Sequence, residues 1–262
     1  MQLSGQNNQI RIKAKLLPAQ NSIEIEQTIT YYNTQQLPLN EIYLHNWANA
    51  YQDQKSPMAK RLLENYDRTL YFARTEEKGY SDIKDITIDE LAVPFDTLPK
   101  IPDIVKITLP KTLDPNDSVT LHAKYIVKVP GDNFTGYGYK DNNYMLRFWY
   151  LVPAVFDGKW NLMSNLDMDD IFVNPADFQI EFSMPKGFTL QSDLNDTYNL
   201  NGDEIVYFLE GKDRVDVEIS IELINTFDSY QTEDTEIITN LDPGKLNPQL
   251  KTRCTQQTVG LY

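Results

Sequence analysis

Apolar and polar residues alternate along much of this 262-residue chain, and this period of two limits the folds that the chain can adopt. Successive side chains of a β-strand point to opposite faces of a sheet, so strict alternation predicts a strand that is buried on one side. In residues 9–16 the apolar positions are Ile10, Ile12, Ala14 and Leu16. The pattern returns in four further stretches, at residues 23–31, 119–129, 178–184 and 215–223.

Shorter apolar runs, bounded by turn-forming residues, also predict strands. These runs cover residues 42–47, 104–109 and 205–209. Turn signals stand at residues 113–118, 130–133, 185–187, 201–203 and 211–213. In total the sequence predicts roughly ten to twelve strands. Because no helix of about 10–15 residues alternates with the strands, a parallel α/β fold is disfavoured, and we expect an all-β, antiparallel domain.

One short helix is expected near residues 56–67. Ser56 can cap this helix, and Pro57 suits its first turn, where a missing backbone donor costs nothing. The apolar face of the helix is expected to comprise Met58, Leu62, Leu63 and Tyr66.

The alternation fades near residue 226, which divides the chain into two unequal parts. We expect a β domain at residues 1–226 and an irregular linker, or the truncated start of a following domain, at residues 227–262.

The lone cysteine, Cys254, excludes a disulfide within the chain. No apolar run approaches ~18 residues, so no membrane span is expected. The first residues lack the apolar core of a signal peptide, which is typical of a cytoplasmic protein or of a periplasmic or cell-envelope protein whose leader was removed.

A formal net charge of −14 restricts the classes of partner. Nucleic acids and anionic membrane surfaces are disfavoured, because their phosphates are bound by clustered Lys and Arg. Solubility alone accounts for such a charge, and steering of a cationic ligand is the alternative.

The chain lacks the motifs of common hydrolases. A zinc hydrolase of the HExxH type needs two histidines one helical turn apart with a glutamate between them. The two histidines, His45 and His122, lie in separate predicted strands; we interpret His45 as a structural residue and His122 as a surface residue. No Gly-x-Ser-x-Gly motif, the signature of many serine hydrolases, occurs.

Acidic residues form clusters at residues 167–170 and 193–204. We interpret both clusters as solvated turns, with a cation site or a carboxylate-based hydrolase as the alternatives.

Aromatic residues concentrate in residues 137–160, and this is the richest local feature of the sequence. Flat rings can stack on a sugar or peptide in a groove, or they can fill the core between two sheets or a domain interface. The candidates for the groove are Tyr144, Arg147, Trp149, Tyr150 and Trp160.

Several motifs, in order and spacing, resemble the amino-terminal domain of M1 family metallopeptidases of the aminopeptidase N type, in the form found in Bacteroidetes-like bacteria. Residues 27–33 (QTITYYN) and 39–50 (LNEIYLHNWANA) are similar to the family's "Y-x-N … L-x-x-I-Y-F-H-x-x-x-N-A" segment. Residues 103–117 (DIVKITLPKTLDPND) resemble the family's segment in which a leucine is followed by a proline-containing turn before a long strand. The remaining similar segments are residues 127–130, 147–153 (RFWYLVP) and 157–160 (DGKW), and Pro185.

The resemblance implies a saddle-shaped, multi-stranded β domain packed against a carboxy-terminal zinc domain that carries HExxH. No cofactor is then expected in this chain, and zinc is expected only in that other domain. In active members a glutamine near the aromatic segment holds the free amino group of the substrate. Alignment on Pro153 places Asn143 or Tyr144 there, so this contact is not carried over.

The function implied is that of a non-catalytic structural and substrate-positioning domain of an M1-like zinc aminopeptidase. Its partners would be the carboxy-terminal catalytic domain of the same protein, docked on an exposed apolar patch, and a peptide substrate. The alternative is a free-standing β-sandwich that binds peptide or glycan through the aromatic cluster at residues 137–160.

Overall fold

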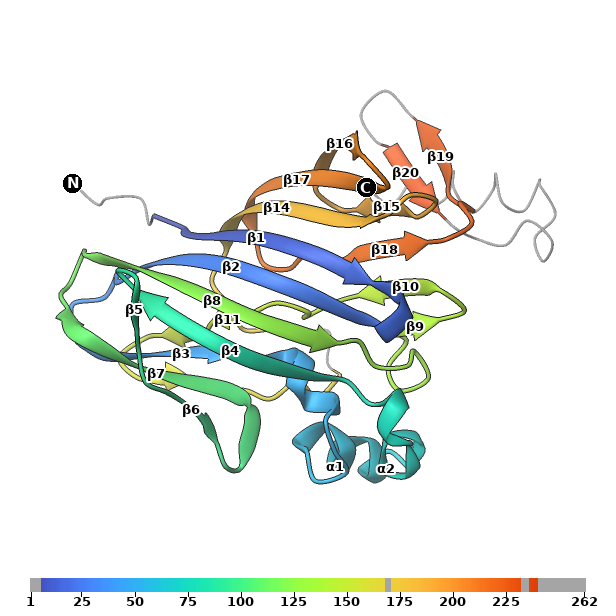
Figure 1. Ribbon diagram of the computed structural model, residues 1–262. Coiled ribbons are helices and arrows are strands. Elements are labelled where there is room, and N and C mark those ends of the chain that lie inside the picture. Colours follow the sequence, from blue (N-terminus) through green and yellow to red (C-terminus); the bar gives the residue numbers. More distant parts are fainter. Residues whose placement is uncertain (1–5, 168–170, 232–235, 240–262) are drawn as a thin grey trace.

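Four of the five long alternating stretches lie in one eight-stranded sheet that runs across the molecule (Figure 1), and the fifth, residues 215–223, contributes a strand to a smaller sheet. The computed structural model describes residues 6–167, 171–231 and 236–239. Across the sheet the strand order is β16-β17-β14-β1-β2-β8-β4-β5. The strands are β1 Asn8–Leu17, β2 Ser22–Tyr32, β4 Tyr80–Ile88, β5 Leu91–Ala92, β8 Ser118–Lys128, β14 Ala176–Pro185, β16 Asn195–Asn201 and β17 Glu204–Arg214. Strands β1 and β14 pair in parallel, and the other neighbours in this sheet are antiparallel.

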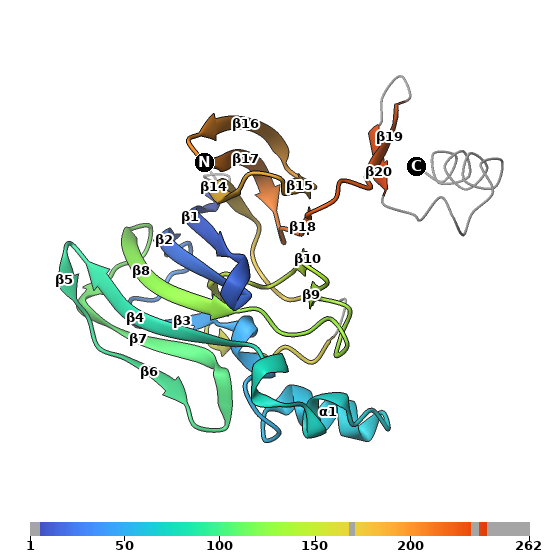
Figure 2. The same cartoon turned by 45° about the vertical axis from the view of Figure 1, so that its right-hand side comes forward.

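Two four-stranded sheets lie on the same side of the large sheet (Figure 2). The first has the order β11-β3-β7-β6 and the second β15-β18-β10-β9. Their strands are β3 Leu39–His45, β6 Phe95–Leu98, β7 Ile101–Leu113, β11 Val152–Pro153, β9 Gly138–Lys140, β10 Asn143–Leu146, β15 Thr189–Ser192 and β18 Ile219–Glu222. A small hairpin pairs β12 Val155–Phe156 with β13 Trp160–Asn161. Residues from all three larger sheets share one continuous hydrophobic core.

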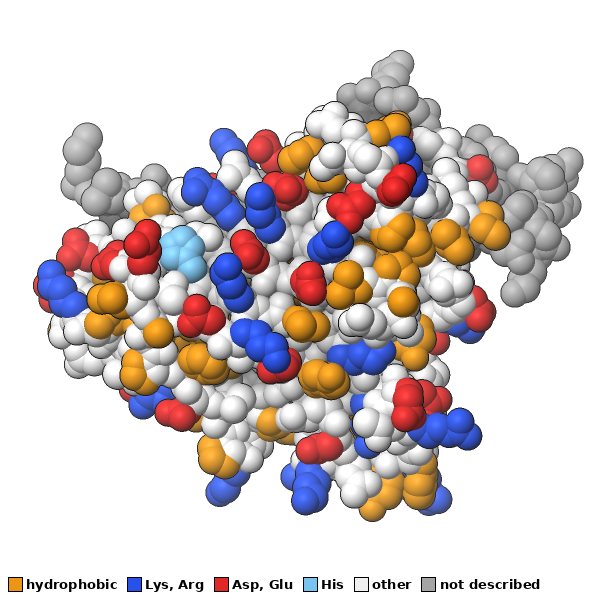
Figure 3. Space-filling model, in the orientation of Figure 1, with side chains coloured by type: hydrophobic (Ala, Val, Ile, Leu, Met, Phe, Trp, Pro, Cys, Tyr) orange, Lys and Arg blue, Asp and Glu red, His pale blue; other side chains and the backbone are white. Residues whose placement is uncertain are grey.

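The core lies where the alternation predicts it. Ile10 and Leu16 are each 1% exposed, whereas Lys13 and Lys15, on the other face of β1, are exposed. Figure 3 shows acidic and basic side chains interleaved over that outer face of the sheet. The prediction of an all-β fold is confirmed.

The helix predicted near residues 56–67 is shorter than expected and is not alone. Helix α1 spans Pro57–Glu64, and the Ala59 amide donates to the capping Ser56 Oγ at 3.1 Å. The prediction that Tyr66 lies on the apolar face is wrong, because its φ of 64° takes the chain out of the helix and leaves the ring 92% exposed. A second helix, α2 (Thr69–Phe72), follows directly. The described residues also contain three 3₁₀ turns, η1 Pro18–Gln20, η2 Trp47–Tyr51 and η3 Thr75–Glu77.

Other local differences have simple causes. Residues 211–213 lie inside β17 at an irregularity of the β-bulge type, where the register with β14 shifts between Gly211↔Phe178 and Arg214↔Ala176. Val215 and Leu223 lie outside β18 and are 51% and 40% exposed. The described residues form twenty strands, more than predicted, because two-residue pairings such as β12 and β13 carry no periodic signal.

Part of the segment beyond residue 226 is also described. Strands β19 (Asp228–Gln231) and β20 (Glu236–Thr239) form a hairpin, and the turned view shows it apart from the sheets (Figure 2). Residues 240–262, including Cys254, lie outside the described residues. The domain boundary near residue 226 stays a prediction. Among the described helices none has the length and apolar character needed to cross a membrane.

Candidate functional site

Three of the five groove candidates are core residues. Tyr144, Trp149 and Tyr150 are each 2% exposed. The Trp149 ring meets Phe182 of β14 nearly edge-on at 5.7 Å, and the Tyr150 ring meets Phe178 in the same manner at 5.5 Å. The segment that carries them runs under the large sheet, so their rings fill the space between sheets and do not reach a groove in this structure.

Trp160 is half-buried and belongs to a different aromatic group. Its ring centroid lies 5.4 Å from that of Tyr43 and 5.1 Å from that of Phe156. The structure therefore does not bring Trp160 together with Arg147, whose surroundings include none of these rings.

A buried glutamine fixes the path of this segment. Gln27 is 2% exposed and stands on the apolar face of β2. Its Nε2 donates to the Leu151 carbonyl at 2.7 Å, and its Oε1 accepts from the Leu151 amide at 3.0 Å and from the Tyr125 hydroxyl. A polar residue at an inward-facing position of an alternating strand is the signal that could have identified this contact, since buried polar groups are almost always hydrogen-bonded.

Arg147 is the groove candidate that lies at the surface, within a group of polar partners. Its Nε donates to Asp216 Oδ2 at 2.7 Å and lies 3.3 Å from Glu218 Oε1. Its Nη1 donates to the Tyr137 hydroxyl at 3.2 Å. The guanidinium carbon lies 4.5 Å from the centre of the Phe148 ring, and the side chain is only 12% exposed. These contacts hold the guanidinium in one orientation.

Phe148 has a strained backbone, and this strain sits beside Arg147. Its φ of 55° is in the left-handed region, which costs a bulky L-residue roughly 1–2 kcal/mol. The ring is 6% exposed and meets Trp47 edge-on at 4.7 Å, so packing holds the conformation. Strain of this kind clusters at functional sites, which marks the Arg147–Phe148 corner as the candidate site.

An open hollow of about 440 Å³ adjoins this corner. Its lining consists of Arg147, Asp193, Asp213, Arg214, Val215, Asp216 and Glu218. Four carboxylates and two guanidinium groups give a net charge of −2, and both arginines are paired with carboxylates. Glu218 is 46% exposed at the rim. The hollow therefore suits a small cationic group better than an anion.

The neighbouring segment 163–165 is anchored by buried groups. Asp103 is fully buried and accepts from Ser164 Oγ at 2.9 Å and from the Asn165 amide at 2.8 Å. Burial raises the pKa of Asp103 to about 6, against the opposing effect of these donors. Trp47 Nε1 donates to the Met163 carbonyl at 2.9 Å.

His45 and His122 have the separate places expected of them. His45 is fully buried and stacks on Trp47 at 4.5 Å; burial lowers its pKa to about 4. His122 lies on the outer face, where its Nδ1 is 3.0 Å from Thr28 Oγ1. In the part of the chain that the structure describes, no three His, Cys, Asp or Glu side chains gather as metal ligands. The described residues therefore do not fit a zinc centre.

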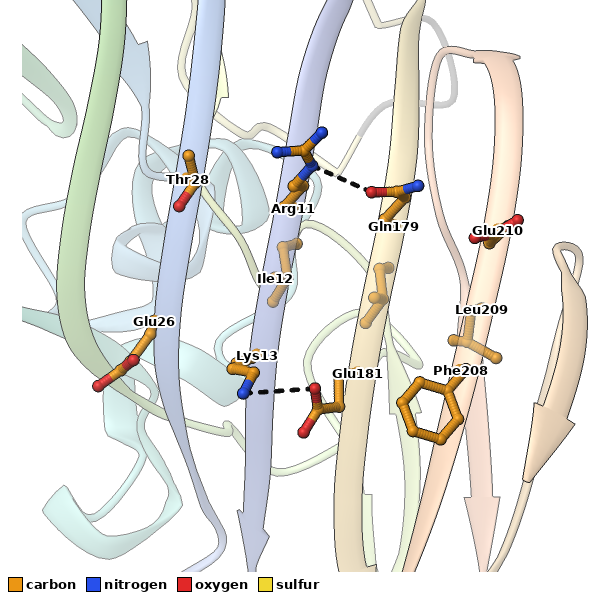
Figure 4. Close-up of a pocket in the computed structure, with 11 residues that line it drawn as sticks. Arg11, Ile12, Lys13, Glu26, Thr28, Gln179, Glu181, Phe208, Leu209 and Glu210 are labelled. Atoms are coloured by element: carbon orange, nitrogen blue, oxygen red, sulfur yellow. Dashed lines mark hydrogen bonds and ion pairs between the residues drawn. The ribbon is translucent and has the colours of Figure 1, made fainter. Parts of the chain in front are cut away.

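A second hollow, of about 430 Å³, opens on the outer face of the large sheet (Figure 4). There Lys13 Nζ lies 3.4 Å from Glu181 Oε2, and Arg11 Nε donates to Gln179 Oε1 at 3.0 Å. Exposed contacts of this kind contribute about 0–1 kcal/mol each to stability, and Glu181 neutralises the charge of Lys13. We interpret this hollow as a solvated sheet face.

Comparison with known proteins gives a match in structure and none in sequence. No protein-family model matches the chain, and no curated protein matches it. A two-domain M1 zinc metallopeptidase variant bound to L-tryptophan matches with a TM-score of 0.52 at 13% identity, over 95% of this chain and 52% of that chain. The M1 zinc metallopeptidase from Deinococcus radiodurans matches with a TM-score of 0.53 at 11% identity, over 95% and 52%. A variant of the Deinococcus radiodurans enzyme bound to a Tyr-Ser-Ala substrate matches at 0.53 and 12%, over 94% and 51%.

The chain spans about half the length of these solved structures. Identity at this level shows a shared fold. The chain thus has the fold of about half of a two-domain M1 zinc metallopeptidase.

Proposed function

We propose that this chain is the amino-terminal, non-catalytic β domain of an M1-like zinc aminopeptidase, of the aminopeptidase N type and the Bacteroidetes-like branch. The observation that carries the proposal is the match of 95% of the chain to about half of a two-domain M1 zinc metallopeptidase. The missing HExxH motif agrees with a supporting role. Hydrolysis would be performed by the carboxy-terminal zinc domain of the same protein.

Substrate positioning is proposed for the Arg147–Phe148 corner. The hollow beside it carries a net charge of −2, which favours the free ammonium group of a peptide over its carboxylate. Arg147, held by Asp216 and Tyr137, would fix the geometry of that wall and keep the carboxylates apart. Fixed groups of this kind position a substrate better than mobile ones.

An apolar surface next to β10 and β18 is proposed as the place where the zinc domain docks. Met145, Leu223 and Ile224 are 39%, 40% and 76% exposed. The Leu223 amide donates to Asn143 Oδ1 at 3.3 Å, which ties the residues that follow β18 to the first residue of β10. Exposed apolar groups of this size mark contact surfaces.

The alternative, a free-standing β-sandwich that binds peptide or glycan through residues 137–160, has less support. Of the two tryptophans that would stack on the ligand, Trp149 is 2% exposed and Trp160 is half-buried among Tyr43 and Phe156, and Tyr144 and Tyr150 are as buried as Trp149. A ligand could reach the buried rings only after the core had opened.

Two experiments test the proposed function. Translation of the coding DNA beyond the Tyr262 codon should give an HExxH motif. A glutamate that serves as the third zinc ligand should follow roughly twenty residues later. The 262-residue chain with added zinc should not hydrolyse aminoacyl reporter substrates. Turnover by this chain alone, or a downstream frame without the motif, would contradict the proposal.

The positioning role has its own test in the two-domain protein. We expect Arg147→Gln to raise KM for a free-amino peptide about tenfold or more, because Asp216 and Glu218 lose the guanidinium that holds them in place, and to change the inhibition constant of an amino-blocked peptide much less. The control is Arg61→Gln on α1, where the arginine makes only an exposed pair with Glu64. Equal effects of Arg147→Gln on free and blocked peptides would reject the role.

A further inference from the structure

Strand β16 forms an open edge of the eight-stranded sheet. It pairs with β17 in unbroken register from Asn195↔Glu210 to Asn201↔Glu204. All seven of its residues are exposed. In the described part of the chain no strand pairs with its other side, so a row of backbone N–H and C=O groups faces solvent.

Apart from the charge of Asp196, the features that normally block such an edge are missing from β16. Its sequence, NDTYNLN, contains no lysine, arginine or proline, and its pairing with β17 shows no bulge. Proteins usually protect exposed edges with these residues, with bulges or with very short strands. The opposite edge of the sheet, β5, has only two residues and is protected by its shortness. The unprotected edge also carries apolar groups, since Tyr198 is 59% and Leu200 is 65% exposed.

The strand is complementary to a second copy of itself. An antiparallel pair centred on Tyr198 uses all seven residues and sets Tyr198 opposite Tyr198. The other opposed pairs are Asn195 with Asn201, Asp196 with Leu200, and Thr197 with Asn199. No like charges face each other in this register, and directly opposed aromatic rings stabilise cross-strand pairs. Tyr198 is already oriented by the Tyr207 ring at 5.4 Å.

We propose that two copies of this chain associate through β16, edge to edge and antiparallel about a twofold axis, to join their eight-stranded sheets into one. Such an interface is isologous, because the same strand serves on both sides. It is independent of the proposed peptidase role, and it uses neither the Arg147 corner nor the apolar surface next to β10 and β18.

Charge gives the pairing a characteristic salt dependence. Each copy has a net charge of −14, so the copies repel one another at low ionic strength. The contact itself consists of backbone hydrogen bonds and uncharged pairs, except for Asp196 opposite Leu200. Salt screens the long-range repulsion over a Debye length of about 8 Å at 0.15 M and leaves such a contact intact. Dimerisation should therefore strengthen several-fold when the salt concentration rises from about 0.05 to about 0.5 M.

The test is a charge exchange at one position, read by light scattering and sedimentation from about 10 µM to about 1 mM protein. The wild-type mass should rise with concentration from 30.3 kDa toward twice that value. Leu200→Asp sets a second carboxylate opposite Asp196 of the other copy and should keep the protein monomeric. Leu200→Lys sets an ammonium there and should dimerise at the same or a lower concentration. Leu91→Asp on β5, at the opposite edge, should behave as the wild type.

Hydrogen exchange gives a second measurement that needs no variant. The amides of residues 195–201 should become protected as the wild-type concentration rises, while those of β5 should not change. A wild-type chain that stays monomeric to about 1 mM overturns the proposal. Equal behaviour of Leu200→Asp and Leu200→Lys, or protection elsewhere without protection of β16, also overturns it.

Discussion

Replacing Gln27 by leucine tests whether one buried side chain fixes the aromatic segment beneath the large sheet. The substitution keeps nearly the same volume and removes three hydrogen bonds, two to Leu151 and one from Tyr125. The Leu151 amide keeps a partner, because it also donates to the Tyr125 hydroxyl oxygen at 3.2 Å. The Leu151 carbonyl and the Tyr125 hydroxyl proton lose theirs.

The expected loss follows from these two orphaned groups. Each buried group left without a partner costs about 1–3 kcal/mol, which gives about 2–6 kcal/mol for the pair. Burial of the leucine side chain in place of the amide returns about 1–2 kcal/mol. From the middle of each range we expect Gln27→Leu to lower the free energy of unfolding by about 2–3 kcal/mol. The control is Thr28→Val on the outer face of β2, which should change it by less than about 0.5 kcal/mol.

Urea unfolding followed by tryptophan fluorescence measures both variants and a double-mutant cycle with Tyr125→Phe. In the Gln27→Leu background the Tyr125 hydroxyl proton has no acceptor, although the oxygen still accepts from the Leu151 amide. Removal of the hydroxyl there exchanges one unpaired group for another, so it should cost about 1 kcal/mol less than in the wild type, where it breaks a satisfied hydrogen bond. A loss below about 0.5 kcal/mol for Gln27→Leu, or strict additivity in the cycle, would refute the reasoning. Buried polar contacts would then not determine the position of Leu151.

Three further predictions concern stability. Burial raises the pKa of Asp103 to about 6, above its unfolded value. Wild-type stability relative to Asp103→Asn should therefore fall by about 2 kcal/mol as pH rises from 4 to 6 in urea titrations, and a constant difference contradicts this. The contribution of His45 to stability changes with pH in the opposite direction, because burial lowers its pKa to about 4, below the unfolded value. Wild-type stability relative to His45→Gln, measured in the same way, should fall by about 3 kcal/mol as pH drops from 6.5 to 4. Ser56→Ala should cost about 1 kcal/mol of thermal or urea stability through the lost helix cap, and Ser56→Gly clearly less.

Asp103 and His45 change the stability of the protein in opposite directions as pH rises. Their contributions to the free energy of unfolding nearly cancel between pH 4 and 6. The wild type should thus show a flatter pH profile in this window than either variant.

The sequence by itself determined the fold class and the buried faces. Alternation is a property of neighbouring residues, so Ile10 and Leu16 could be assigned to the core and Lys13 to solvent without knowledge of the partner strands. The helix start at Ser56 was equally local, since capping needs only the next three residues. The helix end was not, because the left-handed conformation of Tyr66 is stabilised by no residue pattern.

The tertiary structure alone decided how distant segments meet. The parallel pairing of β1 with β14 joins residues more than 150 positions apart, and no local pattern specifies it. The burial of Trp149 and Tyr150 depends on where the chain around Leu151 lies, and Gln27, more than 100 residues away in sequence, holds Leu151 there. An aromatic-rich stretch has the same composition in a core and in a groove. Only the packing of the three sheets against one another distinguishes the two, because burial is a property of the whole assembly of strands.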